Sequence, residues 1–160
     1  MTAAAILPDT RRIGELYTNT LAKTVHVKPG QAADPANSVT ATYVDDSGGI
    51  RCIIVCETTL GACLGAALML IPATVALEEA AKGKLSITLL DTLREILNIS
   101  SQLFRSITSR HRISLGKLYF AGAAVPADLK TMMSKPSGRL DVEIDIADYT
   151  SGRMSLLIIA

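Results

Sequence analysis

The sequence predicts an α+β domain in which helices pack on one face of a mostly antiparallel sheet. A segment with apolar residues at helical spacing comes first and is followed by a hairpin pattern. Helical patterns then fill residues 60–106, and the last third of the chain reads largely as strands. This order of elements is typical of the α+β class. A helix followed by a hairpin occurs near both ends of the chain, which is a weak internal repeat of the element order.

Length and composition indicate one domain, residues 1–160, with a core of its own. Hydrophobic residues make up 49% of the chain, which is too many for a disordered segment. No linker rich in Pro, Gly or Ser divides the chain. A formal net charge of +1 gives no support for nucleic-acid binding, because no face can be strongly basic unless another is acidic.

Three cysteines, Cys52, Cys56 and Cys63, lie within twelve residues of one another. An odd number of cysteines, in a chain that starts without a signal-peptide pattern, indicates reduced thiols in a cytoplasmic protein. We expect these thiols to be buried as small hydrophobic groups. A metal site is not expected, because His26 and His111 are far from them in sequence.

Caps and turn residues define the first elements. Asp9 can cap a helix whose apolar residues repeat as far as Leu21, and His26 is expected at the end of this helix. A polar loop, 28–38, follows it. Residues 39–59 contain two β-rich runs around an Asp-Asp-Ser-Gly-Gly turn, which predicts a hairpin.

Two short helices, 60–70 and 74–83, are expected on either side of Pro72, and the second closes at Gly83. The uncharged stretch 58–77 contains both. Pro72 interrupts it before it reaches the ~20 apolar residues that a membrane span needs. We therefore expect two buried helices and no association with a membrane.

The remaining pattern predicts strands at 113–120, 139–146 and 153–160, with a loop containing Pro126 and Pro136 before the last two. In 139–146, apolar residues alternate strictly with acidic ones, so one face of this strand should be buried. The chain ends in an apolar strand. Such a strand is either buried within its own sheet or exposed at an edge, where it would pair with a second copy and give a homodimer.

The helix that Ser86 can cap, expected to run to about Ser106, carries a narrow polar stripe. The stripe consists of Asp91, Glu95, Asn98 and Gln102, at steps of four, three and four, with Arg94 and Arg105 beside it. Apolar residues and one serine gather on the opposite side: Leu90, Leu93, Ile96, Leu97, Ser100, Leu103 and Phe104. Burial of that side would hold the stripe rigid and directed away from the core.

The stripe has a plain alternative interpretation, the solvated back of an amphipathic helix. Most such surfaces carry Lys together with Glu, however, and this helix has no Lys. Asn is also a mediocre helix former, so an exposed Asn98 in the middle of a helix needs another reason to be tolerated.

The motif Asp91-x-x-x-Glu95-x-x-Asn98 resembles the signature of the CheC/CheX/FliY family of chemotaxis phosphatases. Chain length and the order of elements match this family over nearly the whole chain, although the specific part is confined to residues 91–98. One motif per chain resembles the CheX-like members most closely. In the first helix Asp9, Glu15 and Asn19 have the wrong spacing, with Ile13 at the glutamate position.

The resemblance implies a CheX-like fold and a phosphatase that removes the phosphoryl group from the aspartyl phosphate of a CheY-like response-regulator receiver domain. It implies that Glu95 pairs with a lysine of the receiver, that Asn98 orients the attacking water, and that Asp91 assists at the rim. We expect Arg94 and Gln102 to contact the same partner. It implies no cofactor of this chain's own, with Mg²⁺ bound by the receiver, and a dimer built through the sheet.

Two positions depart from the family pattern. Ala121 stands where a proline is expected, with Pro126 the nearest one, and Asn98 is followed by Ile-Ser-Ser-Gln instead of a Gly-containing turn. A module that binds a receiver without hydrolysis is therefore the alternative. A small-ligand sensor near Pro72 and the thiols has no motif in its favour.

A basic segment, with Arg105, Arg110, His111 and Arg112, follows the long helix. Its charges either complement the helix dipole or steer an acidic partner toward the stripe.

Overall fold

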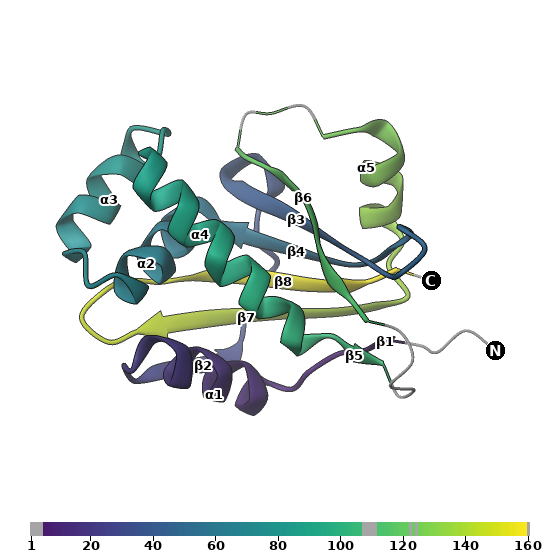
Figure 1. The fold of residues 1–160 in the computed structure, drawn as a ribbon, viewed down its shortest axis with the longest axis horizontal. Coiled ribbons are helices and arrows are strands. Elements are labelled where there is room, and N and C mark those ends of the chain that lie inside the picture. The colour runs from purple at the N-terminus through teal and green to yellow at the C-terminus, as the bar shows by residue number, and fades with distance from the viewer. Residues whose placement is uncertain (1–4, 107–111, 122, 124, 160) are drawn as a thin grey trace.

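An antiparallel sheet of six strands is the base of the fold (Figure 1). The computed structural model describes residues 5–106, 112–121, 123 and 125–159. Its elements are β1 (Ala5–Ile6), α1 (Thr10–Leu21), β2 (Val25–Pro29), η1 (Pro35–Asn37), β3 (Ser38–Val44), β4 (Ile50–Glu57), α2 (Thr58–Leu68), α3 (Ala73–Ala81), α4 (Ile87–Ile99), η2 (Ser100–Leu103), β5 (Arg105–Ser106), β6 (Ser114–Tyr119), α5 (Ala127–Ser134), β7 (Gly138–Ile146) and β8 (Ser151–Ile158). The predicted α+β class and antiparallel sheet are confirmed.

The strand order β2-β7-β8-β4-β3-β6 has an internal two-fold pattern. Each half of the chain supplies a helix, an edge strand and a hairpin, with β3–β4 as the first hairpin and β7–β8 as the second. The edge strand of each half pairs with the hairpin of the other half, β2 with β7 and β6 with β3. This arrangement corresponds to the helix-then-hairpin order that the sequence shows near both ends of the chain. Because of it, neither half completes its part of the sheet alone.

The small-residue helix α2 lies at the centre of the molecule. Its residues 60–67 are all buried, as expected for a helix that is apolar on every side. It contacts β3, β4, β7 and β8 on one side and α3 and α4 on another. Gly152 of β8 admits Leu60, because a Cβ at this glycine would lie 2.7 Å from the Leu60 Cβ. Among the described residues, no helix is long and apolar enough to cross a membrane.

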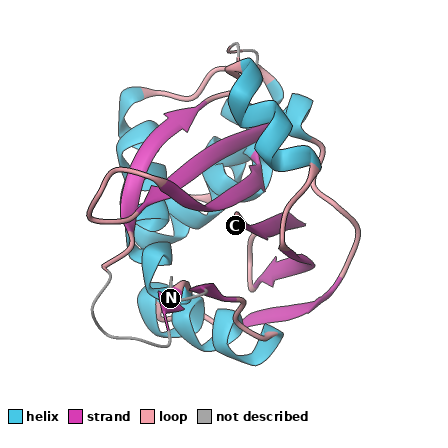
Figure 2. Cartoon of the chain, turned by 90° about the vertical axis from the view of Figure 1, so that its right-hand side faces the viewer, coloured by secondary structure: helices cyan, strands magenta, loops and turns pink. Residues whose placement is uncertain are grey.

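One helix, α5, covers the opposite face of the sheet and was not predicted; seen from the side, helices lie on both sides of the strands (Figure 2). It occupies the region expected to be a loop, and Pro126 stands at its N-cap. Leu129 is its one buried residue, and it packs against Ile53, Val55 and Leu157. A single buried position gives too little periodicity to predict a helix.

Three further expectations are wrong in detail. The long helix does not continue to Ser106, because α4 ends at Ile99 and the 3₁₀ turn η2 follows. Phe104 is nevertheless buried as expected, with its ring 5.2 Å from that of Tyr43. Of the two helices expected to be buried on either side of Pro72, α3 is mostly exposed, with Ala76 as its one buried residue. His26 lies on the edge strand β2 and not at a helix end, because α1 has already ended at Leu21.

The C-terminal strand β8 lies between β7 and β4, inside its own sheet. Of the two expectations for this strand, burial is therefore confirmed, and β8 has no edge to offer to a second chain. A dimer built through the six-stranded sheet would have to use β2 or β6.

All three cysteines are free and buried, as predicted. Burial raises the pKa of the Cys52 thiol to about 12 and that of Cys63 to about 11. It also raises the pKa of Cys56 well above its usual range. The thiols therefore remain protonated at neutral pH and act as small core groups.

Packing of α2 against α4 makes Gly65 a sensitive position. A Cβ there would overlap the Thr92 hydroxyl and lie 3.1 Å from the Leu93 backbone nitrogen. We predict that Gly65→Ala lowers the free energy of unfolding by about 1–3 kcal/mol, because overpacking outweighs the better helix propensity of Ala. Urea denaturation would measure this change.

Gly14→Ala in α1 is the matched control. Its Cβ would meet only ordinary contacts, at 3.5 Å to the Val25 carbonyl oxygen and 3.7 Å to Val27. The same substitution should therefore raise stability here by about 0.5–1 kcal/mol. Equal effects at the two glycines would contradict the close α2–α4 approach.

Candidate functional site

The polar stripe lies on the exposed side of α4, as its periodicity predicted. Asp91, Arg94, Glu95 and Asn98 are all exposed there. The opposite side of α4 is buried through Leu89, Thr92, Leu93, Ile96 and Leu97. Gln102 is exposed as well, but it lies on η2, so the stripe is helical only as far as Asn98.

The N-terminal end of α4 is fixed by its cap. The hydroxyl of Ser86 accepts a hydrogen bond from the Leu89 backbone N–H at 3.3 Å, as the sequence predicted. The backbone N–H of Ser86 donates to the Glu79 carboxylate at 2.5 Å, which ties α4 to α3.

The C-terminal end of α4 is held by two buried tyrosines from different elements. Tyr43 of β3 donates its hydroxyl to the Leu97 carbonyl oxygen at 2.6 Å. The hydroxyl of Tyr17 of α1 lies 2.7 Å from that of Ser100, which in turn donates to the Ile96 carbonyl. Burial raises the pKa of both phenols, so both stay protonated. Asn98 thus lies between two anchored residues.

Among the described residues, no side chain engages the carboxylates and the amide of Asp91, Glu95 and Asn98. Within the described ranges, no ion pair or side-chain hydrogen bond involves Asp91, Glu95 or Asn98. Glu95 and Asn98 are three residues apart, so their Cβ atoms are neighbours on the helix surface, about 5–6 Å apart. A carboxylate and a neutral amide therefore lie side by side on the exposed surface of α4.

An apolar residue extends the stripe and was missed in the sequence. Ile87, four residues before Asp91, is 78% exposed in the first turn of α4. The step of four places it about −40° from Asp91 around the helix, within the stripe. The stripe was defined by polar residues, so an isoleucine in register with it was not included.

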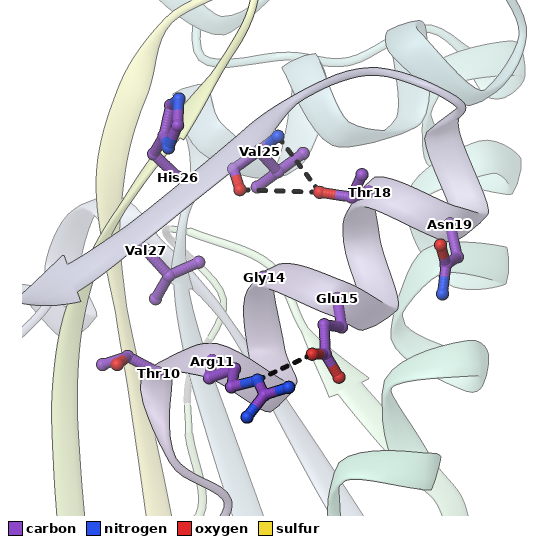
Figure 3. Close-up of a pocket in the computed structure, with 9 residues that line it drawn as sticks. All are labelled: Thr10, Arg11, Gly14, Glu15, Thr18, Asn19, Val25, His26 and Val27. Carbon is purple, nitrogen blue, oxygen red and sulfur yellow. Dashed lines mark hydrogen bonds and ion pairs between the residues drawn. The ribbon is translucent and has the colours of Figure 1, made fainter.

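The first helix carries no second motif. If its buried Ile13 and Tyr17 are matched with Leu93 and Leu97 of α4, Glu15 and Thr18 fall at the positions of Glu95 and Asn98. Figure 3 shows the Glu15 carboxylate paired with Arg11, at 2.9 Å from Nε.

A shallow pocket of about 330 Å³ between α1 and β2 occupies this surface. There the Thr18 hydroxyl accepts from the Val25 N–H at 3.2 Å and donates to the Val25 carbonyl at 3.5 Å (Figure 3). A hydroxyl bonded to the backbone stands here in place of a free amide, which leaves one motif for the chain.

Two other sequence features lie near or outside the site. Ala121, at the position of the expected proline, follows β6 and lines a pocket of about 240 Å³ together with Leu90 of α4. Of the basic segment, Arg112 is exposed, whereas Arg110 and His111 lie outside the described residues.

No protein-family model and no curated protein matches this sequence. Solved structures do match it. FliM of H. pylori, in its complex with SpeE, has a TM-score of 0.61 at 9% identity, covering 94% of this chain and 81% of that chain. The FliM middle domain of Vibrio alginolyticus has a TM-score of 0.59 at 12% identity, with 94% and 88% covered.

CheX of Borrelia burgdorferi, in its complex with CheY, BeF₃ and Mg²⁺, has a TM-score of 0.53 at 17% identity, with 91% and 92% covered. The chain thus has the fold shared by CheX and the FliM middle domain. The fold implied by the motif in α4 is confirmed.

The anchor of α4 by Tyr43 gives a prediction for stability. Tyr43→Phe would leave the buried Leu97 carbonyl without its side-chain donor and should lower the free energy of unfolding by about 1–3 kcal/mol. Tyr119→Phe is the control, because in the described part of the chain its hydroxyl makes no hydrogen bond, and its effect should stay within about 0.5 kcal/mol. Denaturant melts of both variants would test this difference, and equal losses would contradict the anchor.

Proposed function

We propose that this protein is a phosphatase of receiver-domain aspartyl phosphates, with the exposed side of α4 as its docking and catalytic surface. The observation that carries the proposal is the pair Glu95 and Asn98, which lie exposed on a helix fixed at both ends and have no side-chain partner in the described part of the chain. The fold is in agreement, because the CheX neighbour was solved in a complex with CheY.

The reaction requires this chain mainly to position the attacking water and the receiver. A water oxygen attacks the phosphorus, the bond from phosphorus to the receiver's aspartyl oxygen breaks, and inorganic phosphate and a free carboxylate are formed. The side-chain carbonyl oxygen of Asn98 orients the water by accepting a hydrogen bond from it. Glu95 pairs with a lysine of the receiver, and the Mg²⁺ belongs to the receiver. Phosphoryl transfer depends mainly on positioning and charge stabilisation, so a fixed amide suffices.

Docking uses the rest of the stripe. Asp91 and Arg94 flank the pair and contact the receiver surface around the phosphorylation site. Gln102 lies beyond the helix end, where the backbone carbonyl of this residue accepts a hydrogen bond from Arg12 of α1. Ile87 adds an apolar contact at the other end of the stripe. Its burial by the partner would increase affinity independently of the charges on the partner.

The central prediction concerns Asn98. Asn98→Ala should lower the rate of phosphate release from a phosphorylated CheY-like receiver by about 100-fold or more, because a transition-state contact is lost. Asn19→Ala, an exposed asparagine of α1, is the matched control and should leave the rate unchanged. Single-turnover assays with acetyl-phosphate-treated receiver would measure both rates. An Asn98→Ala variant as fast as the wild type would rule out this mechanism.

A second prediction concerns Ile87. Ile87→Ala should weaken receiver binding by about three- to tenfold, because the buried side chain loses most of its apolar area. Leu70→Ala is the control, since Leu70 is 77% exposed but lies between α2 and α3, away from the stripe. Titration calorimetry would compare the dissociation constants. If Leu70→Ala weakened binding and Ile87→Ala did not, the docking surface would lie elsewhere.

A receiver-binding module without hydrolysis is the second candidate. The FliM structures that were solved with SpeE and with FliG have TM-scores of 0.61 and 0.50, against 0.53 for the CheX structure. In addition, Ala121 departs from the phosphatase pattern. Such a module would bind the phosphorylated receiver at α4 without accelerating the loss of phosphate. Binding and turnover measured on the same sample separate the two candidates.

A further inference from the structure

A second pocket lies on the far face of the sheet, beneath α5. It has a volume of about 470 Å³, which falls in the range of about 300–1,000 Å³ that is usual for ligand sites. The pocket and the α4 site lie on opposite faces of the sheet, because successive residues of a strand point to opposite faces. Ile53, Val55 and Leu157 face α5, whereas their neighbours Ile54 and Leu156 face the main core.

The interior of this pocket is aliphatic. Val55 and Leu157 of the sheet, Val125 before α5 and Met133 of α5 line it, together with Ala33 from the β2–β3 connection. No aromatic side chain is among the described residues that line it. An unbranched thioether such as Met133 adapts to flexible chains. The shape and lining therefore favour an alkyl chain over a flat ring.

The rim of the pocket is cationic. Its charged lining residues are Lys130 of α5 and Arg139 of β7. Arg139 Nε lies 3.0 and 3.1 Å from the two carboxylate oxygens of Asp141. Among the described residues, Lys130 has no acidic partner. Two cations against one carboxylate leave one positive charge to be matched.

A hydrogen-bond chain holds the rim in place. The Asp141 carboxylate accepts from the Ser155 hydroxyl at 2.7 Å, and that hydroxyl accepts from the Ala33 N–H at 2.9 Å. The chain ties the β2–β3 connection, β8 and β7 together and orients Arg139 through its Nε. The terminal nitrogens of the guanidinium make no other hydrogen bond within the described ranges, so they are available to an anion.

We propose that this pocket binds an aliphatic monocarboxylate, a free medium-chain fatty acid. The alkyl chain would lie among Val55, Leu157 and Met133, and the carboxylate would meet Lys130 and Arg139 at the rim. Filling the pocket removes apolar surface from water and supplies dispersion contacts that the empty space lacks. The site is independent of α4 and of the proposed phosphatase activity.

Titration calorimetry with sodium decanoate, below its micelle-forming concentration, would test the proposal. Decanoate should bind and raise the melting temperature, decanol should bind more weakly, and decyltrimethylammonium should not bind. Lys130→Gln should weaken decanoate binding by about tenfold and leave decanol binding unchanged. Lys135→Gln, with the same charge change at the end of the same helix, should alter it by less than about twofold.

Two further results complete the test. Ala32→Trp places an indole at the mouth of the pocket and should abolish the binding of both decanoate and decanol, while thermal melts confirm that the variant folds. Absence of decanoate binding to the wild type would overturn the proposal. Decanoate binding that is insensitive to Lys130→Gln would also overturn it, as would a stable dimer that occludes the pocket.

Discussion

The close approach of α2 and α4 at Gly61 and Gly65 is the contact on which the exposed side of α4 depends. At Gly61 a Cβ would lie 2.9 Å from a Leu93 methyl group, and at Gly65 it would overlap Thr92. Because these positions are glycines, α4 packs closely against α2, which itself packs on the sheet. The tyrosine contacts from α1 and β3 then fix where α4 ends. The exposed side of α4 is thus a rigid row of side chains whose spacing is set by the core.

This arrangement separates the groups that stabilise α4 from those that we propose for recognition. The groups that fix α4 are buried and belong to α1, α2 and β3, whereas Asp91, Glu95 and Asn98 make no side-chain hydrogen bond or ion pair with the described residues. Substitution of Asn98 or Glu95 should therefore change recognition with little effect on folding. The pocket beneath α5 lies on the opposite face of the sheet, so the sheet separates it from α4. The two-fold pattern of the strands explains why α1 resembles α4 in position, although α1 has Thr18 where α4 has Asn98.

Much of the fold could be predicted, because its signals are local. Asp9 and Ser86 cap their helices, Pro72 separates α2 from α3, and β7 alternates as a half-buried strand should. The misses have nonlocal causes. The end of α4 depends on Tyr17 and Tyr43, which are distant in sequence. Leu129 holds α5 against strands β4 and β8, one of which precedes α5 in the sequence and the other follows it. The polar stripe was predictable from its spacing, whereas Ile87 was hidden by its apolar character.

The side-chain amide signal of Asn98 offers the most direct test of the central claim, that α4 presents this group to a receiver. In a nitrogen-edited NMR titration with a receiver activated by beryllium fluoride, the Asn98 side-chain NH₂ signals should shift or broaden. Those of Asn19 and Asn37, exposed elsewhere, should remain where they are. Unchanged Asn98 signals in a saturated complex would contradict the account, because the receiver would then be bound by another surface.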